Sequence, residues 1–158
     1  MTSKLTLTLG DELMRIAESA TDQHTTFQIN LASMSEQFFP DGRLKASALE
    51  NAIEWTEDRL QLAQFSKPEN AFLYTSDFHV QKLYLAAGIK VADGALLHVD
   101  AVEQTFSRLV MQANGQAPGQ DLLPEAGVFY STLVVVRELM HHLKFPFLAL
   151  YDVAGNKS

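Results

Sequence analysis

The chain has 158 residues, of which 47% are hydrophobic and 20% are charged, and its formal charge is −7. These values are typical of one globular domain, which we expect over residues 1–152, with 153–158 as a flexible tail. The absence of cysteine excludes disulfides, thiolate zinc sites, iron–sulfur clusters and cysteine nucleophiles. No run of Lys and Arg is present, which argues against nucleic acid and anionic membranes as partners.

The chain begins with one lysine and no apolar core of signal-peptide length, so a cytoplasmic protein is the simplest expectation. Its most apolar stretch, residues 126–151, contains only three charged side chains, Arg137, Glu138 and Lys144. As a helix, residues 126–136 would extend about 16 Å, whereas a bilayer core measures about 30 Å. We therefore expect this stretch in a protein core or an interface and not in a membrane.

The first elements are predicted from alternation and spacing. Residues 4–9 alternate leucine with threonine, which is typical of a strand, and residues 25–31 alternate in the same way. Between them, Leu13, Ile16, Ala17 and Ala20 recur at helical spacing, which predicts a helix over residues 11–20. Residues 40–42, Pro-Asp-Gly, predict a turn.

A helix is predicted after this turn, because Ser47 and Glu50 have the spacing of a capping box and apolar residues follow at helical spacing up to Ala63. An acidic stripe occupies another face of that helix. We interpret this stripe as a solvated surface, with an acidic docking site or a divalent-cation site as the alternative. Its members are Glu50, Glu54, Glu57 and Asp58.

The second half of the chain also alternates short apolar runs with helical patterns. Residues 71–74 predict a strand, residues 78–87 a helix capped by Asp77, and residues 89–91 a strand, which together suggest a strand–helix–strand unit. A short apolar run over 94–98 precedes a helix capped by Asp100 that continues to 113. Residues 113–124, which contain two glycines and two prolines, predict a loop.

The last predicted elements are a helix over 125–143 and an extended segment over 144–151. The helix is apolar around nearly its whole circumference, so it must be central in the domain or lie at a subunit interface. The fold class that we predict is α/β or α+β: a helix-rich single domain with a small mixed sheet and a buried C-terminal helix.

Two groups of residues are candidates for a site. Glu138, His141 and His142 contain one Glu-x-x-His pattern, so they are the candidate metal ligands, although a di-metal site would need a second copy that the sequence lacks. The alternative interpretation is that both histidines cap the end of a helix. Asp77 and His79 follow a predicted strand and are the candidate ligand-binding residues.

The sequence contains no phosphate-loop, dinucleotide-binding or Gly-x-Ser-x-Gly pattern, so we lean against an enzyme. We expect a cytoplasmic binding or regulatory domain that forms a homodimer, requires no cofactor and binds a protein or small ligand, the latter under the loop at 113–124. The alternative hypothesis is a metal-assisted enzyme or metal sensor in which Glu138, His141 and His142 hold a divalent metal.

Overall fold

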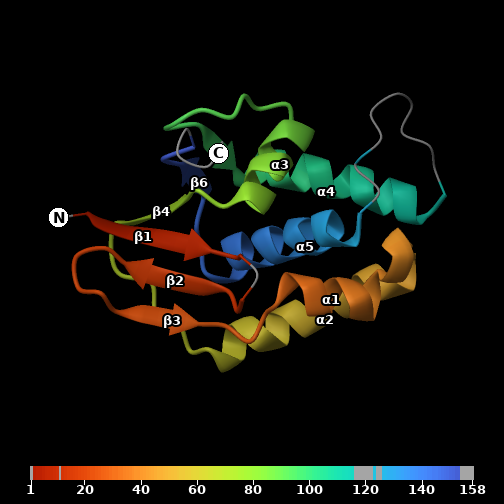
Figure 1. The fold of residues 1–158 in the computed structure, drawn as a ribbon, viewed down its shortest axis with the longest axis horizontal. Helices are drawn as coiled ribbons and strands as arrows, with labels where there is room; N and C mark the ends of the chain where they lie inside the picture. Colours follow the sequence, from red (N-terminus) through yellow and green to blue (C-terminus); the bar gives the residue numbers. More distant parts are fainter. Residues whose placement is uncertain (1, 11, 116–122, 124–125, 154–158) are drawn as a thin grey trace.

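The computed structural model describes residues 2–10, 12–115, 123 and 126–153. These residues form a six-stranded sheet in the order β3-β2-β1-β4-β6-β5 (Figure 1). The strands are β1 (Ser3–Thr8), β2 (Arg15–Glu18), β3 (His24–Thr26), β4 (Ala71–Thr75), β5 (Leu96–His98) and β6 (Phe147–Leu150). The helices are α1 (Leu31–Phe38), η1 (Pro40–Gly42), α2 (Ala46–Leu62), α3 (Phe78–Ala86), α4 (Val99–Ala113) and α5 (Gly127–His142).

The sheet is mixed. Its three central strands, β1, β4 and β6, are parallel, so their carboxyl ends lie at one edge. β2 and β3 continue the sheet on one side as an antiparallel hairpin, and β5 closes the other side antiparallel to β6. Leu5 and Leu7 of β1 face the core and are 2% and 1% exposed, as the alternation of leucine and threonine predicts.

The prediction of a helix over residues 11–20 is wrong. The chain turns at Gly10, which has a φ of 45°, and returns as β2 antiparallel to β1. Met14 and Ile16 are buried while Arg15 is exposed, so the stretch follows a two-residue period. The apolar residues of this stretch fit both a helical and a two-residue period. The strand forms because pairing with β1 gives its backbone amides and carbonyls hydrogen-bond partners.

The other N-terminal predictions are confirmed in part. Residues 24–26 form β3, and Phe27 and Ile29 are buried as expected, but Asn30 then caps the short helix α1 that the sequence did not predict. The helix after the turn is confirmed as α2. Its N-cap is Lys45, so Ser47 lies inside the first turn and makes no capping bond.

Later elements agree more closely with prediction. Asp77 caps α3, β6 lies within the predicted extended segment, and α5 covers most of the predicted last helix. Residues 89–91 form no strand, however, and the parallel neighbours of β4 are β1 and β6. The helix over 99–113 is confirmed as α4, with His98 and not Asp100 at its N-cap.

Helix α5 lies in the middle of the molecule, between α1 and α2 on one side and α3 and α4 on the other (Figure 1). Eleven of its residues are buried, including Val134, Val135 and Val136, which are 0% exposed. An all-round apolar helix needs such a central position, because it has no face to offer to water. The structure thus confirms the predicted class: a helix-rich single domain with a small mixed sheet and a buried C-terminal helix.

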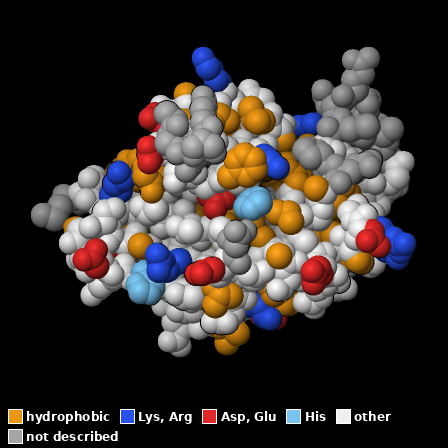
Figure 2. Space-filling view, viewed as in Figure 1, with side chains coloured by type: hydrophobic (Ala, Val, Ile, Leu, Met, Phe, Trp, Pro, Cys, Tyr) orange, Lys and Arg blue, Asp and Glu red, His pale blue; other side chains and the backbone are white. Residues whose placement is uncertain are grey.

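In the part of the chain that the structure describes, no helix has the length and apolar character needed to span a bilayer. On the face shown in Figure 2, acidic and basic side chains are interspersed. The predicted tail over 153–158, apart from Val153, and most of the loop predicted over 113–124 lie outside the described residues.

Candidate functional site

Glu138 is a carboxylate on the most deeply buried helix of the protein. Its side chain is 4% exposed, although the neighbouring Arg137 is 24% exposed. The apolar run before it fixes α5 in the core, and Glu138 lies on the side of the last two turns that packs toward α2. Buried carboxylates are uncommon unless they are paired or bind a metal, so this position calls for a chemical explanation.

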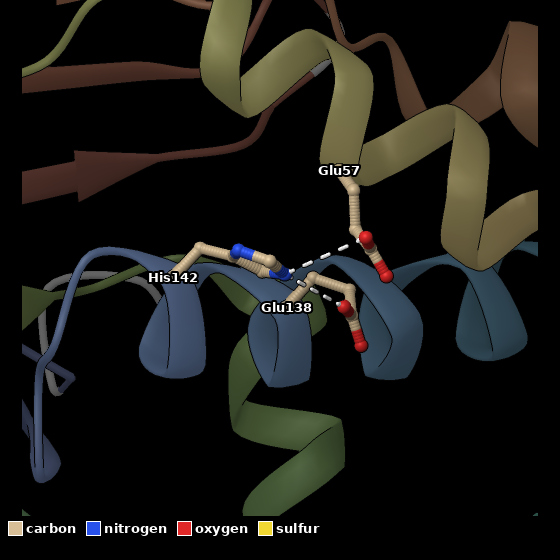
Figure 3. A group of neighbouring side chains, drawn as sticks. All are labelled: Glu57, Glu138 and His142. Atoms are coloured by element: carbon tan, nitrogen blue, oxygen red, sulfur yellow. Dashed lines mark ion pairs between the residues drawn. The ribbon is translucent and has the colours of Figure 1, made fainter.

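Two side chains, one from α5 and one from α2, lie close to this carboxylate (Figure 3). His142 lies one turn further along α5, and Glu57 comes from the middle of α2. One potential ligand atom from each lies within 4.8 Å of the others. His142 Nε2 is 3.4 Å from Glu138 Oε1 and 3.9 Å from Glu57 Oε2. We call Glu57, Glu138 and His142 the α2–α5 cluster.

The spacing of the cluster suits a small metal ion. Zinc binds nitrogen and carboxylate oxygen at about 2.0–2.1 Å, and tetrahedral angles then separate neighbouring donor atoms by about 3.4 Å. The two distances from His142 Nε2 equal or slightly exceed that value. The side chains of Glu57 and His142 are each 36% exposed, so an ion held here would be reached from solvent.

Burial raises the pKa of Glu138 above its ordinary value, and the negative charge of Glu57 adds to this shift. The positive charges of Arg137 and His142 oppose the shift but do not cancel it. The cluster therefore holds a carboxylate whose ionised form lacks full compensation from the protein. A cation at the cluster would supply the missing positive charge, and such perturbed groups are enriched at functional sites.

A second set of polar contacts joins α5 to α4. Arg137 Nη1 donates to Glu138 Oε2 at 2.8 Å, and Arg137 Nε donates to Glu103 Oε1 at 2.8 Å. His141 Nε2 lies 2.6 Å from the same oxygen of Glu103. Burial acts to raise the pKa of Glu103, but the hydrogen bonds and charges of His141 and Arg137 outweigh it, so this pKa lies below its ordinary value.

The structure thus divides the three predicted metal residues. Glu138 and His142 come together, whereas His141 turns to Glu103 on α4 and is not among the cluster residues. Adjacent helical positions point about 100° apart, which explains this division. Glu57, which the sequence placed only in an acidic stripe, completes the cluster. The one sequence signal for it was the alternative interpretation of that stripe as a cation site.

Asp77 has a structural role that its sequence position only partly indicates. Its Oδ1 accepts from the amide of His79, which caps α3, and its Oδ2 accepts from the amides of Leu9 and Gly10 at 3.2 and 2.9 Å. The carboxylate therefore joins the end of β1 to the start of α3. It takes up three backbone donors that would otherwise suit an anionic ligand.

His79, the other predicted ligand-binding residue, lies on the wall of a cavity of about 280 Å³ between α3 and the start of α5. Lys82, Val128 and Phe129 also line this cavity. Asp77 and His79 are two residues apart in the chain, but their side chains lie in different environments. Their predicted role in ligand binding remains a prediction.

A polar row crosses the sheet beside the carboxyl end of β1. Thr8, Arg15 and Thr26 are directly opposite one another on β1, β2 and β3, so their side chains share one face. The three residues line a hollow of about 580 Å³ next to the turn at Gly10. A guanidinium and two hydroxyls are groups that can bind an anion, and ligands of open α/β sheets usually bind at this edge. This row was not predicted from the sequence, because Arg15 lies in the stretch for which a helix was predicted.

No family model matches the chain, and no curated protein matches it. Solved structures do resemble it. A PPX-GPPA enzyme of Aquifex aeolicus superimposes with a TM-score of 0.69 over 95% of this chain at 10% identity, and the same holds for a type II variant described as a Ppx/GppA phosphatase. An exopolyphosphatase-like protein gives a TM-score of 0.58 over 94% at 14% identity.

This likeness establishes a shared fold. The chain spans about half the length of the solved structures it resembles, because it covers 53% of the Aquifex chain and 54% of the exopolyphosphatase-like protein. A fold alone does not determine an activity, so the residues of the candidate site carry the functional argument.

Proposed function

We propose that this protein is a divalent-metal-binding domain that holds its ion at Glu57, Glu138 and His142. The observation that carries the proposal is the convergence of three potential ligand atoms within 4.8 Å. Two of these residues are on α5, which the core fixes, and the third is on α2, which packs against α5. The side chains are therefore arranged before an ion arrives, which lowers the entropic cost of binding.

The composition of the cluster supports an ion of the zinc or manganese class. One imidazole and two carboxylates form a mixed nitrogen and oxygen donor set, and three protein ligands leave coordination positions open. A bound ion would supply a Lewis acid and a positive charge for an anionic ligand. Because the cluster is partly exposed, these open positions suit either a metal-assisted enzyme or a metal sensor, the alternative predicted from the sequence.

The test is metal titration of metal-free protein with Zn²⁺, Mn²⁺ and Mg²⁺ by calorimetry. We expect one ion per chain, and a loss of affinity on the order of 100-fold or more in His142→Ala and in Glu138→Gln. The matched control is His141→Ala, which removes the neighbouring histidine of the same helix and should leave affinity unchanged. Equal losses in both histidine variants, or no binding to the unaltered chain, would contradict the proposal.

A second candidate function is the binding or hydrolysis of a phosphate-containing ligand at the row of Thr8, Arg15 and Thr26. Two observations favour it. Arg15 is paired with Thr8 and Thr26 on its two neighbouring strands, beside the carboxyl end of β1. The similar structures are those of a Ppx/GppA phosphatase and an exopolyphosphatase-like protein. The domain would then either contribute part of a larger phosphate-binding site or bind the phosphate-containing ligand on its own.

The test of this second candidate uses pyrophosphate and tripolyphosphate as probes. We expect binding that weakens about tenfold in Arg15→Gln, since a charge-assisted pair of this kind contributes about 1.5–3 kcal/mol. Arg43→Gln, which removes the same charge from the loop before α2, serves as the control. Phosphate release in the presence of Mg²⁺ would assign an enzymatic role, whereas equal binding by both variants would indicate only general charge attraction.

A further inference from the structure

The two oxygens of Glu138 have different partners. Oε1 faces His142 Nε2 at 3.4 Å, inside the α2–α5 cluster. Oε2 accepts a hydrogen bond of 2.8 Å from Arg137 Nη1, outside it. This bond engages Oε2 and sets a positive charge beside it, which favours coordination of an ion through Oε1 alone. The proposed site is therefore shaped by a residue that does not belong to it.

Arg137 is itself held in place from α4. Its Nε donates to Glu103 Oε1 at 2.8 Å, and its guanidinium carbon lies 4.1 Å from the centre of the Phe106 ring. His141 contacts the same oxygen of Glu103. The guanidinium is planar and donates from Nε to Glu103 and from Nη1 to Glu138. Because Glu103 holds the guanidinium in place, the guanidinium fixes the orientation of the Glu138 carboxylate. This arrangement resembles the outer contacts that orient the ligands of metal sites.

Resting on the proposed metal function, we infer that Arg137 is a positioning residue that restricts Glu138 to coordination through one oxygen and so selects against calcium. Calcium takes six to eight oxygen ligands and commonly uses both oxygens of a carboxylate. Zinc-class ions accept four ligands, so one oxygen from Glu138 is sufficient. The contact from α4 thus determines which class of ion the cluster accepts.

The experiment measures coordination and selectivity in Arg137→Gln. Cobalt is the probe, because Co²⁺ substitutes for zinc and its visible absorption is intense at four ligands and weak at six. We expect Co²⁺ bound to the unaltered protein to absorb intensely and to resist displacement by Ca²⁺. In Arg137→Gln the absorption should weaken, and Ca²⁺ should displace Co²⁺ at a concentration lower by about tenfold.

Two further variants make the result decisive. Arg59→Gln removes the same charge from α2, where the guanidinium lies over the Trp55 ring and not at the cluster, and should change neither readout. Glu103→Gln weakens the anchor of Arg137 and should shift both readouts in the direction of Arg137→Gln. It also provides the test if Arg137→Gln does not fold.

The possible outcomes separate the two claims. If the unaltered protein binds Co²⁺ and the variants at Arg137 and Glu103 keep its spectrum and its resistance to Ca²⁺, the inference about Arg137 is overturned while the metal site stands. If neither the unaltered protein nor these variants bind Co²⁺, both the inference and the proposed metal function are overturned. If Arg137→Gln weakens the Co²⁺ absorption and lowers about tenfold the Ca²⁺ concentration that displaces Co²⁺, both the metal site and the inference about Arg137 are supported.

Discussion

Glu138 carries a charge that the folded protein disfavours. Its carboxylate is buried, and burial raises its pKa, so the ionised form is disfavoured in the folded protein. When folding raises the pKa of a carboxyl group, the free energy of unfolding decreases as pH increases from the ordinary pKa through the raised one. At neutral pH and without metal, Glu138 therefore lowers the stability of the fold.

The first prediction is that Glu138→Gln stabilises the metal-free protein at pH 7 by about 1 kcal/mol, because the amide keeps a hydrogen-bond acceptor for Arg137 and removes the buried charge. The gain should shrink as pH falls toward the ordinary pKa of the carboxyl, where the unaltered residue takes up a proton. Urea unfolding at several pH values measures it. Glu54→Gln on the exposed face of α2 controls for net charge, and a destabilised Glu138→Gln would contradict the prediction.

Glu103 has the opposite behaviour. Burial acts against its charge, but His141 and Arg137 lower its pKa below the ordinary value. A carboxyl group whose pKa is lowered by folding stabilises the protein at pH values above its ordinary pKa. This stabilisation is lost as pH falls through the lowered pKa. Because the side chain is 38% exposed, solvent and salt screen the effect.

The second prediction is that Glu103→Gln destabilises the protein at pH 7 by less than about 1 kcal/mol, and that the difference fades as pH falls from the ordinary pKa of the carboxyl through the lowered one. Thermal unfolding from pH 3 to pH 7 measures it, and the effect should decrease in 0.5 M salt. Glu36→Gln on α1 is the matched exposed control. A difference that is the same at pH 3 and at pH 7 would show that packing and not charge accounts for the loss.

At the scale of elements, α5 approaches α1 very closely at its first residue. A Cβ built on Gly127 would lie 3.0 Å from the carbonyl oxygen of Phe39 and 3.2 Å from the Cβ of Ser35. Ser35 Oγ and Ser131 Oγ, one turn further along α5, are 2.9 Å apart. Small and polar residues thus let the two backbones meet at the start of α5.

The third prediction follows from this contact. Gly127→Ala should lower the free energy of unfolding by about 1–3 kcal/mol, because the nearest atom is the backbone carbonyl oxygen of Phe39, which must shift to make room. Thermal unfolding measures the loss. Ser107→Ala, on the exposed side of α4, should have little effect and provides the control. An unchanged or higher melting temperature would show that α1 moves without cost.

The sequence predicted elements best where one periodicity dominated. The long helices α2, α4 and α5 were identified because their apolar stripes persist for several turns. The stretch before Ala20 was assigned wrongly because its apolar residues fit both a helix and a strand, and only pairing with β1 decides between them. Short α1 escaped prediction because Asn30 caps it directly after an alternating run.

The candidate site was predictable only within one helix. Glu138 and His142 are four residues apart, so local spacing brings them together. Glu57 joins them only through the packing of α2 against α5, which no local pattern reports. Arg15 and its threonine neighbours likewise meet through strand register and not through sequence proximity.

At the scale of the whole molecule, the packing of α5 gives no support for self-association. The apolar circumference of α5 suggested a subunit interface, but the four other α-helices of the described chain already pack around it. Among the described residues, the most exposed of the large apolar side chains lie elsewhere. Leu62 ends α2 and is 73% exposed, whereas Phe78 and Leu85 lie on α3 and are 57% and 63% exposed.

The fourth prediction is that the protein is nevertheless a homodimer, formed through α3, where Phe78 and Leu85 lie seven residues apart on one side of the helix. Light scattering at micromolar concentration should give the mass of two chains, and Leu85→Glu should reduce it to one. Leu62→Glu, which makes the same change at the end of α2, should leave the dimer intact. The mass of a single chain for the unaltered protein would remove self-association, and the exposed leucines would then be ordinary surface residues.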